Sequence, residues 1–369
     1  MRKVLFALLL TAWSVALISC QNKSSEQVTE PADTLQLSFP GERHLQHIRQ
    51  LTFGGDNAEA YWSFDNTKLV FQRTDHQQYK CDQIFVGAVQ PLLAGDTGVF
   101  RYRLVSTGKG RTTCAFFLPG DSLILYSSTH LDADTCPPVP DRSKIGKYVW
   151  PVYNTFEIFI ADLNGRIRRQ LTNNRFYDAE ATVSPRGDRI VFTSNRDGDL
   201  ELYSMKLDGS DVRRLTHAFG YDGGAWFSPD GSQIVWRASR PTAIEEKNSY
   251  RRLLKEGLVA PNRMELWIAN ADGSKARQIT RLGGANWAPV FTPDGKKILF
   301  SSNHRYERGF PFDLFLINTD GTGLEQVTFS GSFDSFPMFS FDGKYLVWCS
   351  NRHSADSRST NIFVAEWLP

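Results

Sequence analysis

The chain has 369 residues, of which 41% are hydrophobic and 13% aromatic, and this is enough to build a large core. The whole chain has 42 basic and 40 acidic residues and a formal charge of +2, and without the basic start Arg2-Lys3 the remaining 40 basic and 40 acidic residues balance. Because no basic surplus remains, nucleic acid is not expected as a partner.

The first twenty residues differ from the rest of the chain. After Arg2-Lys3, residues 4–17 form an apolar stretch too short for a membrane span, and Leu17-Ile18-Ser19-Cys20 closes it. This ending resembles the lipobox of bacterial lipoproteins, which implies a signal peptide over 1–20 and lipidation of Cys20. Gln21, where an Asp would indicate retention in the inner membrane, favours the outer membrane, facing the periplasm or the cell surface. The alternative is an ordinary signal peptide in which the Cys is incidental.

Residues 21–45 are polar, with Pro and Ser and few large apolar groups. Such a composition cannot bury enough apolar surface to order the chain. We therefore expect a flexible tether between the lipid anchor and a folded part that begins near residue 46.

The folded part is built on the phrase AWFSPDGSQIVW, residues 225–236. It predicts a strand, a tight turn and a second strand, because Pro229 suits the first turn position and Asp230-Gly231 supplies the positive φ that the turn needs. The phrase occurs six times without gaps, and apolar residues follow five and seven positions after each anchor. A repeat architecture follows from this periodicity. The anchors are Phe64, Pro119, Pro185, Pro229, Pro293 and Phe341.

A third strand follows each of these hairpins, and the first five repeats add a fourth. The third strands begin at Gln83, Glu157, Glu201, Glu265, Asp313 and Asn361. The last repeat runs out of chain, whereas His47 to Thr52 reads as a fourth strand with no blade before it. We therefore predict an all-β, six-bladed β-propeller over residues 46–369, with four strands per blade. The strand at His47 to Thr52 closes the ring by joining the C-terminal blade, and the propeller is expected to be monomeric.

The phrases RRLTHAFGYDGGAWFSPDGSQIVW and GTGLEQVTFSGSFDSFPMFSFDGKYLVW resemble the Pro-Asp-Gly propeller repeats of the TolB-like family. TolB carries an α/β domain before its propeller, and prolyl-oligopeptidase-type enzymes carry a hydrolase domain with a GxSxG motif. This sequence has neither. The resemblance therefore implies a free-standing propeller that binds a protein or peptide without catalysis.

Two connections between second and third strands are unusually long. They span 130–154 and 239–262, and the second contains a predicted short helix over Ile244 to Glu256. In an up-and-down blade these connections leave on the same face as the connections between blades. We expect both long loops to stand over one mouth of the ring, which is where function is most often found.

Two sets of residues at matching positions point to the same mouth. Seven residues before the anchors the chain has carboxylates in three blades, with Glu180 close to one of them. Eleven residues after the anchors five of six residues are Arg or His. A mouth that carries negative and positive side chains could bind a zwitterionic peptide, a sugar acid or a cation. The alternative is that each Arg pairs with the Asp of the next blade and only fixes blade register. The candidate residues are Asp178, Glu180, Asp222, Asp334, His130, Arg196, Arg240, His304 and Arg352.

The remaining cysteines and histidines suggest a disulfide but no metal. Cys81, Cys114 and Cys136 all fall on the mouth face, and we expect one disulfide, with Cys114–Cys136 preferred and Cys81 as the alternative partner of Cys136. Cys349 reads as a buried residue of a strand. The histidines lie on separate loops at no metal-ligand spacing, so neither a metal nor a cofactor is predicted.

The leading hypothesis is an envelope lipoprotein whose propeller mouth binds a protein or peptide. An enzyme that uses the same mouth, either a polysaccharide lyase or a hydrolase, is the first alternative. A structural scaffold is the second. The shape of the central opening separates them, because an open pocket of mixed charge favours a ligand and closed salt bridges between blades favour a scaffold.

Overall fold

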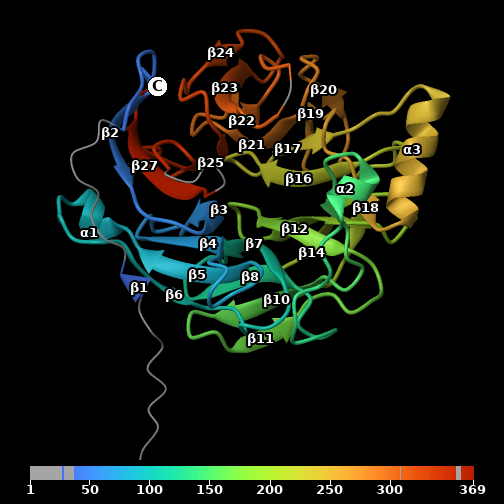
Figure 1. Cartoon of the computed structure of the whole chain (residues 1–369), viewed down its shortest axis with the longest axis horizontal. Coiled ribbons are helices and arrows are strands. Elements are labelled where there is room, and N and C mark those ends of the chain that lie inside the picture. Colours follow the sequence, from blue (N-terminus) through green and yellow to red (C-terminus); the bar gives the residue numbers. More distant parts are fainter. Residues whose placement is uncertain (1–26, 29–36, 308, 355–358) are drawn as a thin grey trace, which may run out of the picture.

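The computed structural model describes residues 27–28, 37–307, 309–354 and 359–369, and these form a ring of antiparallel sheets around a central axis (Figure 1). The predicted signal peptide over 1–20 and Cys20, the predicted lipidation site, lie outside the described residues. Within the described part of the chain, no helix has the length and apolar character needed to cross a membrane.

Six blades of four strands each make up the ring, as predicted. In each blade the strands follow from the axis outwards, and every third strand begins at the predicted residue. Blade one contains β3 (Asp56–Trp62), β4 (Lys68–Thr74), β5 (Gln83–Ala88) and β6 (Arg101–Leu104). Blade two contains β7 (Thr112–Phe117), β8 (Leu123–Ser128), β10 (Glu157–Asp162) and β11 (Ile167–Gln170). Blade three contains β12 (Asp178–Val183), β13 (Arg189–Ser194), β14 (Glu201–Lys206) and β15 (Arg213–Arg214).

The last three blades repeat this plan. Blade four contains β16 (Asp222–Phe227), β17 (Gln233–Ala238), β19 (Glu265–Asn270) and β20 (Arg277–Gln278). Blade five contains β21 (Asn286–Phe291), β22 (Lys297–Ser302), β23 (Asp313–Asn318) and β24 (Glu325–Gln326). Blade six contains β25 (Asp334–Phe339), β26 (Tyr345–Ser350), β27 (Asn361–Trp367) and β2 (Leu45–Gln50). A short strand, β1 (Gln27–Val28), adds to the outer edge of blade one beside β6.

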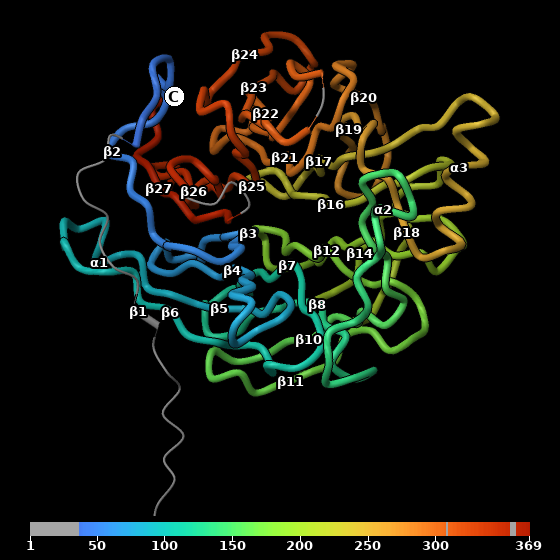
Figure 2. Tube along the Cα trace, viewed as in Figure 1, coloured from blue at the N-terminus to red at the C-terminus, as the bar shows by residue number. Residues whose placement is uncertain are grey.

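The ring closes through the N-terminal strand. Strand β2 pairs antiparallel with β27, with Leu45 opposite Trp367 and Gln50 opposite Phe363. Figure 2 shows the two ends of the propeller side by side in blue and red. The strand lies where the sequence predicts it, although it begins two residues earlier than His47. The last blade thus has no free edge at β27.

Residues 37–44, which the sequence assigns to the tether, pack against the propeller instead. Glu42 is buried and accepts hydrogen bonds from the Arg352 guanidinium at 3.0 and 3.1 Å. Arg352 also donates to Asp334 at 3.1 Å and lies over the rings of Phe39 and Trp348. A polar segment is ordered here because its one buried charge meets an opposite charge, and composition alone does not reveal that.

Each innermost strand contains a β-bulge five residues before its anchor. At this point the pairing register shifts and one residue takes a φ between 45° and 60°. A bulge re-aims the side chain that it carries, here into the space at the axis. The six bulge residues are Glu59, Cys114, Glu180, Gly224, Ala288 and Phe336.

Below the bulges, a layer of aromatic side chains fills the axis. The Trp226 ring lies 4.8 Å from that of Tyr61 and 5.5 Å from that of Phe116, measured between centroids. Trp226 lines cavities on both sides of this layer, so the aromatic plug separates the two mouths of the ring.

The two long loops are joined to each other, which the sequence did not predict. Strand β9 (Trp150–Pro151) of the first loop pairs with β18 (Leu258–Val259) of the second. The first loop also contains α2 (Arg142–Ile145), and α1 (Gln90–Leu93) lies in the connection between β5 and β6. The predicted helix is confirmed as α3 (Ile244–Lys255), which begins where the Glu246 carboxylate accepts backbone hydrogen bonds from Thr242 and Ala243. Both loops stand over one mouth (Figure 1).

The buried Glu42–Arg352 pair should contribute strongly to stability. Glu42→Ala leaves the guanidinium with one carboxylate fewer in a buried setting, and we expect the free energy of unfolding to fall by about 3 kcal/mol. Arg43→Ala removes an exposed pair with Glu325 and should cost less than about 0.5 kcal/mol. Urea denaturation followed by tryptophan fluorescence measures both. Equal effects of the two substitutions would contradict a structural role for the buried pair.

Candidate functional site

A cavity of about 260 Å3 opens at the mouth that carries the two long loops. Its walls come from all six blades and from the first long loop, and they are mostly aromatic. The aromatic residues are Tyr148, Trp150, Tyr153, Phe156, Tyr177, Trp287, Phe310, Phe333 and Phe336. The charged residues are Glu59, Asp82, Arg111, Glu180 and Arg237.

An ion pair between two blades forms one side of the floor. Arg237 of β17 donates to Oε1 of Glu180, the bulge residue of β12. The other Glu180 oxygen accepts from Thr193 at 2.7 Å, from Tyr221 at 3.0 Å and from the Gly224 amide at 3.1 Å. Burial opposes the charged form of Arg237, but the acidic groups around it, of which Glu180 contributes most, together outweigh burial and raise the pKa of the guanidinium. The guanidinium therefore stays charged, and its contact with Glu180 holds it in place.

Glu59 forms the other side of the floor and is only partly satisfied. Its carboxyl group hydrogen-bonds the Cys114 thiol, while Oε2 is shielded from solvent and has no partner within the described ranges. Burial raises the pKa of Glu59 to about 7; the Cys114 contact lowers it, and the charge of Glu180 raises it. Burial also raises the pKa of the Cys114 thiol well above its usual value, so the thiol stays protonated at neutral pH.

The Asp82–Arg111 pair lies at the rim of the cavity. Arg111 Nη1 is 2.5 Å from Asp82 Oδ2, and Thr74 donates to the other Asp82 oxygen at 2.7 Å. Among the carboxylates that line the cavity, Asp82 and Glu180 thus each have an arginine partner. Glu59 is left without a cationic hydrogen-bond partner in the described structure.

The predicted rings of Asp and Arg are used inside single blades. Arg196 lies 2.8 Å from Asp178 and Arg240 lies 2.5 Å from Asp222, and Arg352 meets Asp334 in the same way. The expectation of pairing with the next blade is wrong, because Asp178 stands opposite Ser194 in one hairpin and the Arg follows two residues later. These pairs brace the open end of each hairpin rather than line the cavity.

The predicted histidines take up a similar position in two blades. His130 packs against Phe159 and His304 against Phe315, both with ring centroids 4.5 Å apart. Each Nδ1 lies 2.9 Å from a serine hydroxyl of its own hairpin. Burial lowers the pKa of both rings, which keeps them neutral at pH 7. Neither histidine lines the cavity.

Glu180 is the one predicted site residue that lines the cavity, and the other main residues were missed. Position counting could have found Glu59 and Cys114, which lie five residues before their anchors, as Glu180 does. Arg237 comes eight residues after its anchor, where the other blades have Gln, Ser, Thr or Cys. No pattern of charge singles it out. Trp287 and Phe333 look like ordinary core residues in the sequence.

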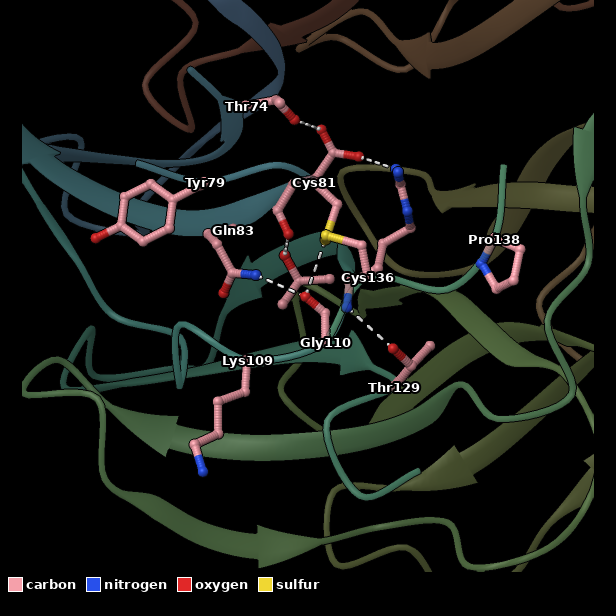
Figure 3. Close-up of a disulfide and its surroundings, with 12 residues drawn as sticks. Thr74, Tyr79, Cys81, Gln83, Lys109, Gly110, Thr129, Cys136 and Pro138 are labelled. Atoms are coloured by element: carbon pink, nitrogen blue, oxygen red, sulfur yellow. Dashed lines mark hydrogen bonds and ion pairs between the residues drawn. A yellow bond between two sulfur atoms is a disulfide. The ribbon is translucent and has the colours of Figure 1, made fainter. Parts of the chain in front are cut away.

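The disulfide joins Cys81 to Cys136, with a Cα–Cα distance of 5.9 Å, so the preferred pairing of Cys114 with Cys136 is wrong and the alternative partner is correct. The bulge at Cys114 directs its thiol to Glu59, away from the loop. Figure 3 shows the bridge beside Gly110, whose carbonyl oxygen accepts from Gln83 at 2.8 Å. The first long loop is thereby tied to blade one, next to Asp82 at the cavity rim.

Six four-stranded blades around a plugged axis, with a loop-covered cavity at one mouth, define a six-bladed β-propeller. Residues 140–257 match the family described as TolB beta propeller domain. Over these residues the chain is similar to the propeller of TolB. A search of curated protein sequences finds no significant match.

Solved structures show the same fold. A TolB-type protein from Agrobacterium tumefaciens is 21% identical, with a TM-score of 0.52 over 85% of this chain and 91% of its own. A gluconolactonase from Xanthomonas campestris is 12% identical, with a TM-score of 0.55 over 88% of this chain and 91% of its own. At such identities the likeness concerns the fold alone.

The raised pKa of Glu59 predicts a pH-dependent cost in stability. Between about pH 4.5 and 7 Glu59 is protonated in the native state and ionised in the unfolded state, so stability falls as the pH rises through this window. Glu59→Gln removes this cost and should raise the free energy of unfolding by about 2 kcal/mol at pH 8, with little change at pH 4.5. Glu307→Gln, at an exposed position, is the control. Urea denaturation at both pH values tests this, and a pH-independent effect would contradict it.

Peptide mapping by mass spectrometry tests the disulfide. Digestion of the unreduced, alkylated protein should yield a peptide that links Cys81 to Cys136, with Cys114 and Cys349 alkylated after unfolding. Cys81→Ser should destabilise the protein by roughly 4 kcal/mol, because the bridge closes a loop of 55 residues. A peptide that links Cys114 to Cys136 would show that the loop is tied to blade two instead.

Proposed function

We propose that this protein is an exported, lipid-anchored envelope protein whose propeller binds a peptide segment of a partner protein in the mouth cavity. The anchor rests on the Leu17-Ile18-Ser19-Cys20 ending of the apolar start, with the outer membrane as its place and the periplasm or cell surface as its side. The binding role rests on the cavity.

The observation that carries the binding role is an aromatic-walled cavity with a charged floor. Trp150 and Trp287 stand 4.9 Å apart between ring centroids, and Tyr148 lies beside Trp287. Aromatic side chains offer large contact areas at a small cost in conformational entropy, which is why they dominate recognition sites. The Glu180–Arg237 pair at the floor can exchange hydrogen bonds with a polar backbone or side chain.

The loops that cover the cavity are held in advance of binding. The Cys81–Cys136 bridge fixes the first loop to blade one, and the β9–β18 pairing fixes it to the second loop. Arg237 lies over the Trp150 ring at 5.2 Å, so the floor also supports the wall. A preformed site loses less entropy on binding, which favours a recognition role.

The size of the cavity favours a segment of a larger partner. At about 260 Å3 it is smaller than the roughly 300–1,000 Å3 of sites that enclose drug-sized molecules. It has room for one side chain or chain end, while the exposed rims of the two loops supply the surface for the rest of a peptide. A pure scaffold would need salt bridges that close the mouth between blades. The Asp–Arg rings pair within blades instead, and the inter-blade pair of Glu180 with Arg237 lies at the floor and leaves the cavity open.

Selection of peptides from a displayed library tests the proposal. We expect wild-type propeller to enrich peptides that bind with a measurable Kd by fluorescence anisotropy, and Trp150→Ala to weaken that binding at least about tenfold. Phe176→Ala is the matched control. Phe176 is 40% exposed in the connection between blades two and three and does not line the cavity.

Three results would contradict the proposal that the mouth cavity binds a peptide. Failure to enrich any binder would overturn the binding role, and equal losses in Trp150→Ala and Phe176→Ala would place the site outside the cavity. Turnover of an oligouronide or peptide that Glu59→Gln abolishes would replace binding by catalysis. The observation that favours this enzymatic alternative is the Glu59 carboxyl group, whose pKa of about 7 suits a general acid or base.

A further inference from the structure

Resting on the proposed function, we infer that the group of the partner peptide that enters the mouth cavity is a primary ammonium, from a lysine side chain or from a free N-terminus. Three features of the cavity lead to this inference: its unbalanced charge, the shape of its acceptor and the aromatic walls around that acceptor.

The charges that line the cavity do not cancel. Asp82 pairs with Arg111, and Glu180 pairs with Arg237. Glu59 remains, with its Oε2 shielded from water and without a hydrogen-bond partner in the described part of the chain. When Glu59 is ionised, the cavity carries one uncompensated negative charge in a place where a carboxylate is costly to bury. A ligand cation removes that cost.

The acceptor suits a compact cation. Within the described ranges Oε2 of Glu59 has no hydrogen-bond partner, although it is shielded from water, and the carboxyl group also contacts the Cys114 thiol. A guanidinium is best bound by two parallel hydrogen bonds to both carboxylate oxygens, and the Glu180–Arg237 pair already occupies the neighbouring position. An ammonium is a point charge whose three donors rotate freely, so a single free oxygen can serve it.

The walls suit the rest of such a ligand. Tyr177 and Phe336 line the same cavity as Glu59, and Trp150 and Tyr148 come from the loop above. Aromatic faces attract a desolvated cation, and the site already places Arg237 over Trp150 at 5.2 Å and over Tyr221 at 5.6 Å. An alkyl chain that carries the ammonium would contact the same rings through its methylene groups.

Ionisation of Glu59 then controls affinity. The groups that face it come from six different elements or loops, and their positions decide its charge. They are Tyr61, Asp82, Cys114, Glu180, Arg237 and Cys349. An ammonium binds the ionised carboxylate, so affinity falls as the pH drops below about 7, the pKa of Glu59 in the free protein.

Titration with four small amides tests the inference directly, with tryptophan fluorescence as the readout. The probes are N-acetyl-lysine methylamide, its arginine and norleucine analogues, and alanine methylamide, which presents a free α-amine. At pH 8 we expect the lysine probe to bind at least about tenfold more tightly than the norleucine and arginine probes. Its affinity should fall by about thirtyfold between pH 8 and 5.5.

The binding affinity between pH 7 and 9 distinguishes a lysine side chain from a free N-terminus. Lysine stays protonated to pH 9, so a lysine site keeps its affinity there, whereas an α-amine with a pKa of about 8 loses its charge. Tighter binding of alanine methylamide than of the lysine probe at pH 7, with loss at pH 9, would assign the site to a chain terminus.

Two variants separate the charge of Glu59 from its structural effects. Glu59→Gln should weaken the lysine probe at least about tenfold and abolish the dependence on acidic pH. Glu157→Gln is the matched control, because Glu157 is also buried with an unpartnered Oε2 but does not line the cavity. We expect it to bind like wild type.

Other outcomes would overturn the inference. Equal binding of the lysine and norleucine probes, undiminished binding in Glu59→Gln, or no binding of any amine at millimolar concentration would each exclude an ammonium site. If library peptides without a free amine still bind and still depend on Trp150, the cavity binds a peptide and only the ammonium is wrong. If no peptide binds either, the proposed function itself fails.

Discussion

The pairing of β2 with β27 is the interaction on which the rest of the structure depends. Each blade buries its faces only against its neighbours, so an open ring would expose a strand edge and the apolar faces of two blades. The N-terminal strand closes that gap, and the buried Glu42–Arg352 pair holds the segment before it. Walls of the mouth cavity that come from distant parts of the sequence keep their places because the ring is closed.

Within the closed ring, one set of polar residues stabilises the blades and another lines the cavity. The Asp–Arg pairs at the open ends of the hairpins are buried or nearly so, and tryptophan side chains donate to two of the same carboxylates, at 2.6 Å for Asp222 and 3.1 Å for Asp334. They stabilise single blades. The bulge residues closer to the plug differ from blade to blade, and they supply the acid, the thiol and the carboxylate at the floor of the cavity. The residues that recur from blade to blade stabilise the fold, and the residues that vary at the bulge position form the floor of the cavity.

The fold was predictable in detail because its signal is repeated. Six anchors in phase, with apolar residues at matching positions, locate the strands of every blade, and the unpaired segment near His47 locates the closure. The site was predictable only in part. Glu180 lies in the cavity, while the Arg and His residues chosen with it brace hairpins or pack on phenylalanine rings. Charge at a matching position shows that residues share a place in the blade, but not whether they face the axis or each other.

The sequence by itself determined the repeat, the number of blades, the strand that closes the ring and the face that carries the long loops. These depend on local chemistry, namely turn residues with positive φ and alternation of apolar side chains. The tertiary structure decided which carboxylate of the cavity has no arginine partner among the described residues, which cysteines pair and how the two loops meet through β9 and β18. Such properties arise where side chains from different blades come within hydrogen-bonding distance around one axis. Their energies depend on burial and on neighbours that no stretch of sequence contains.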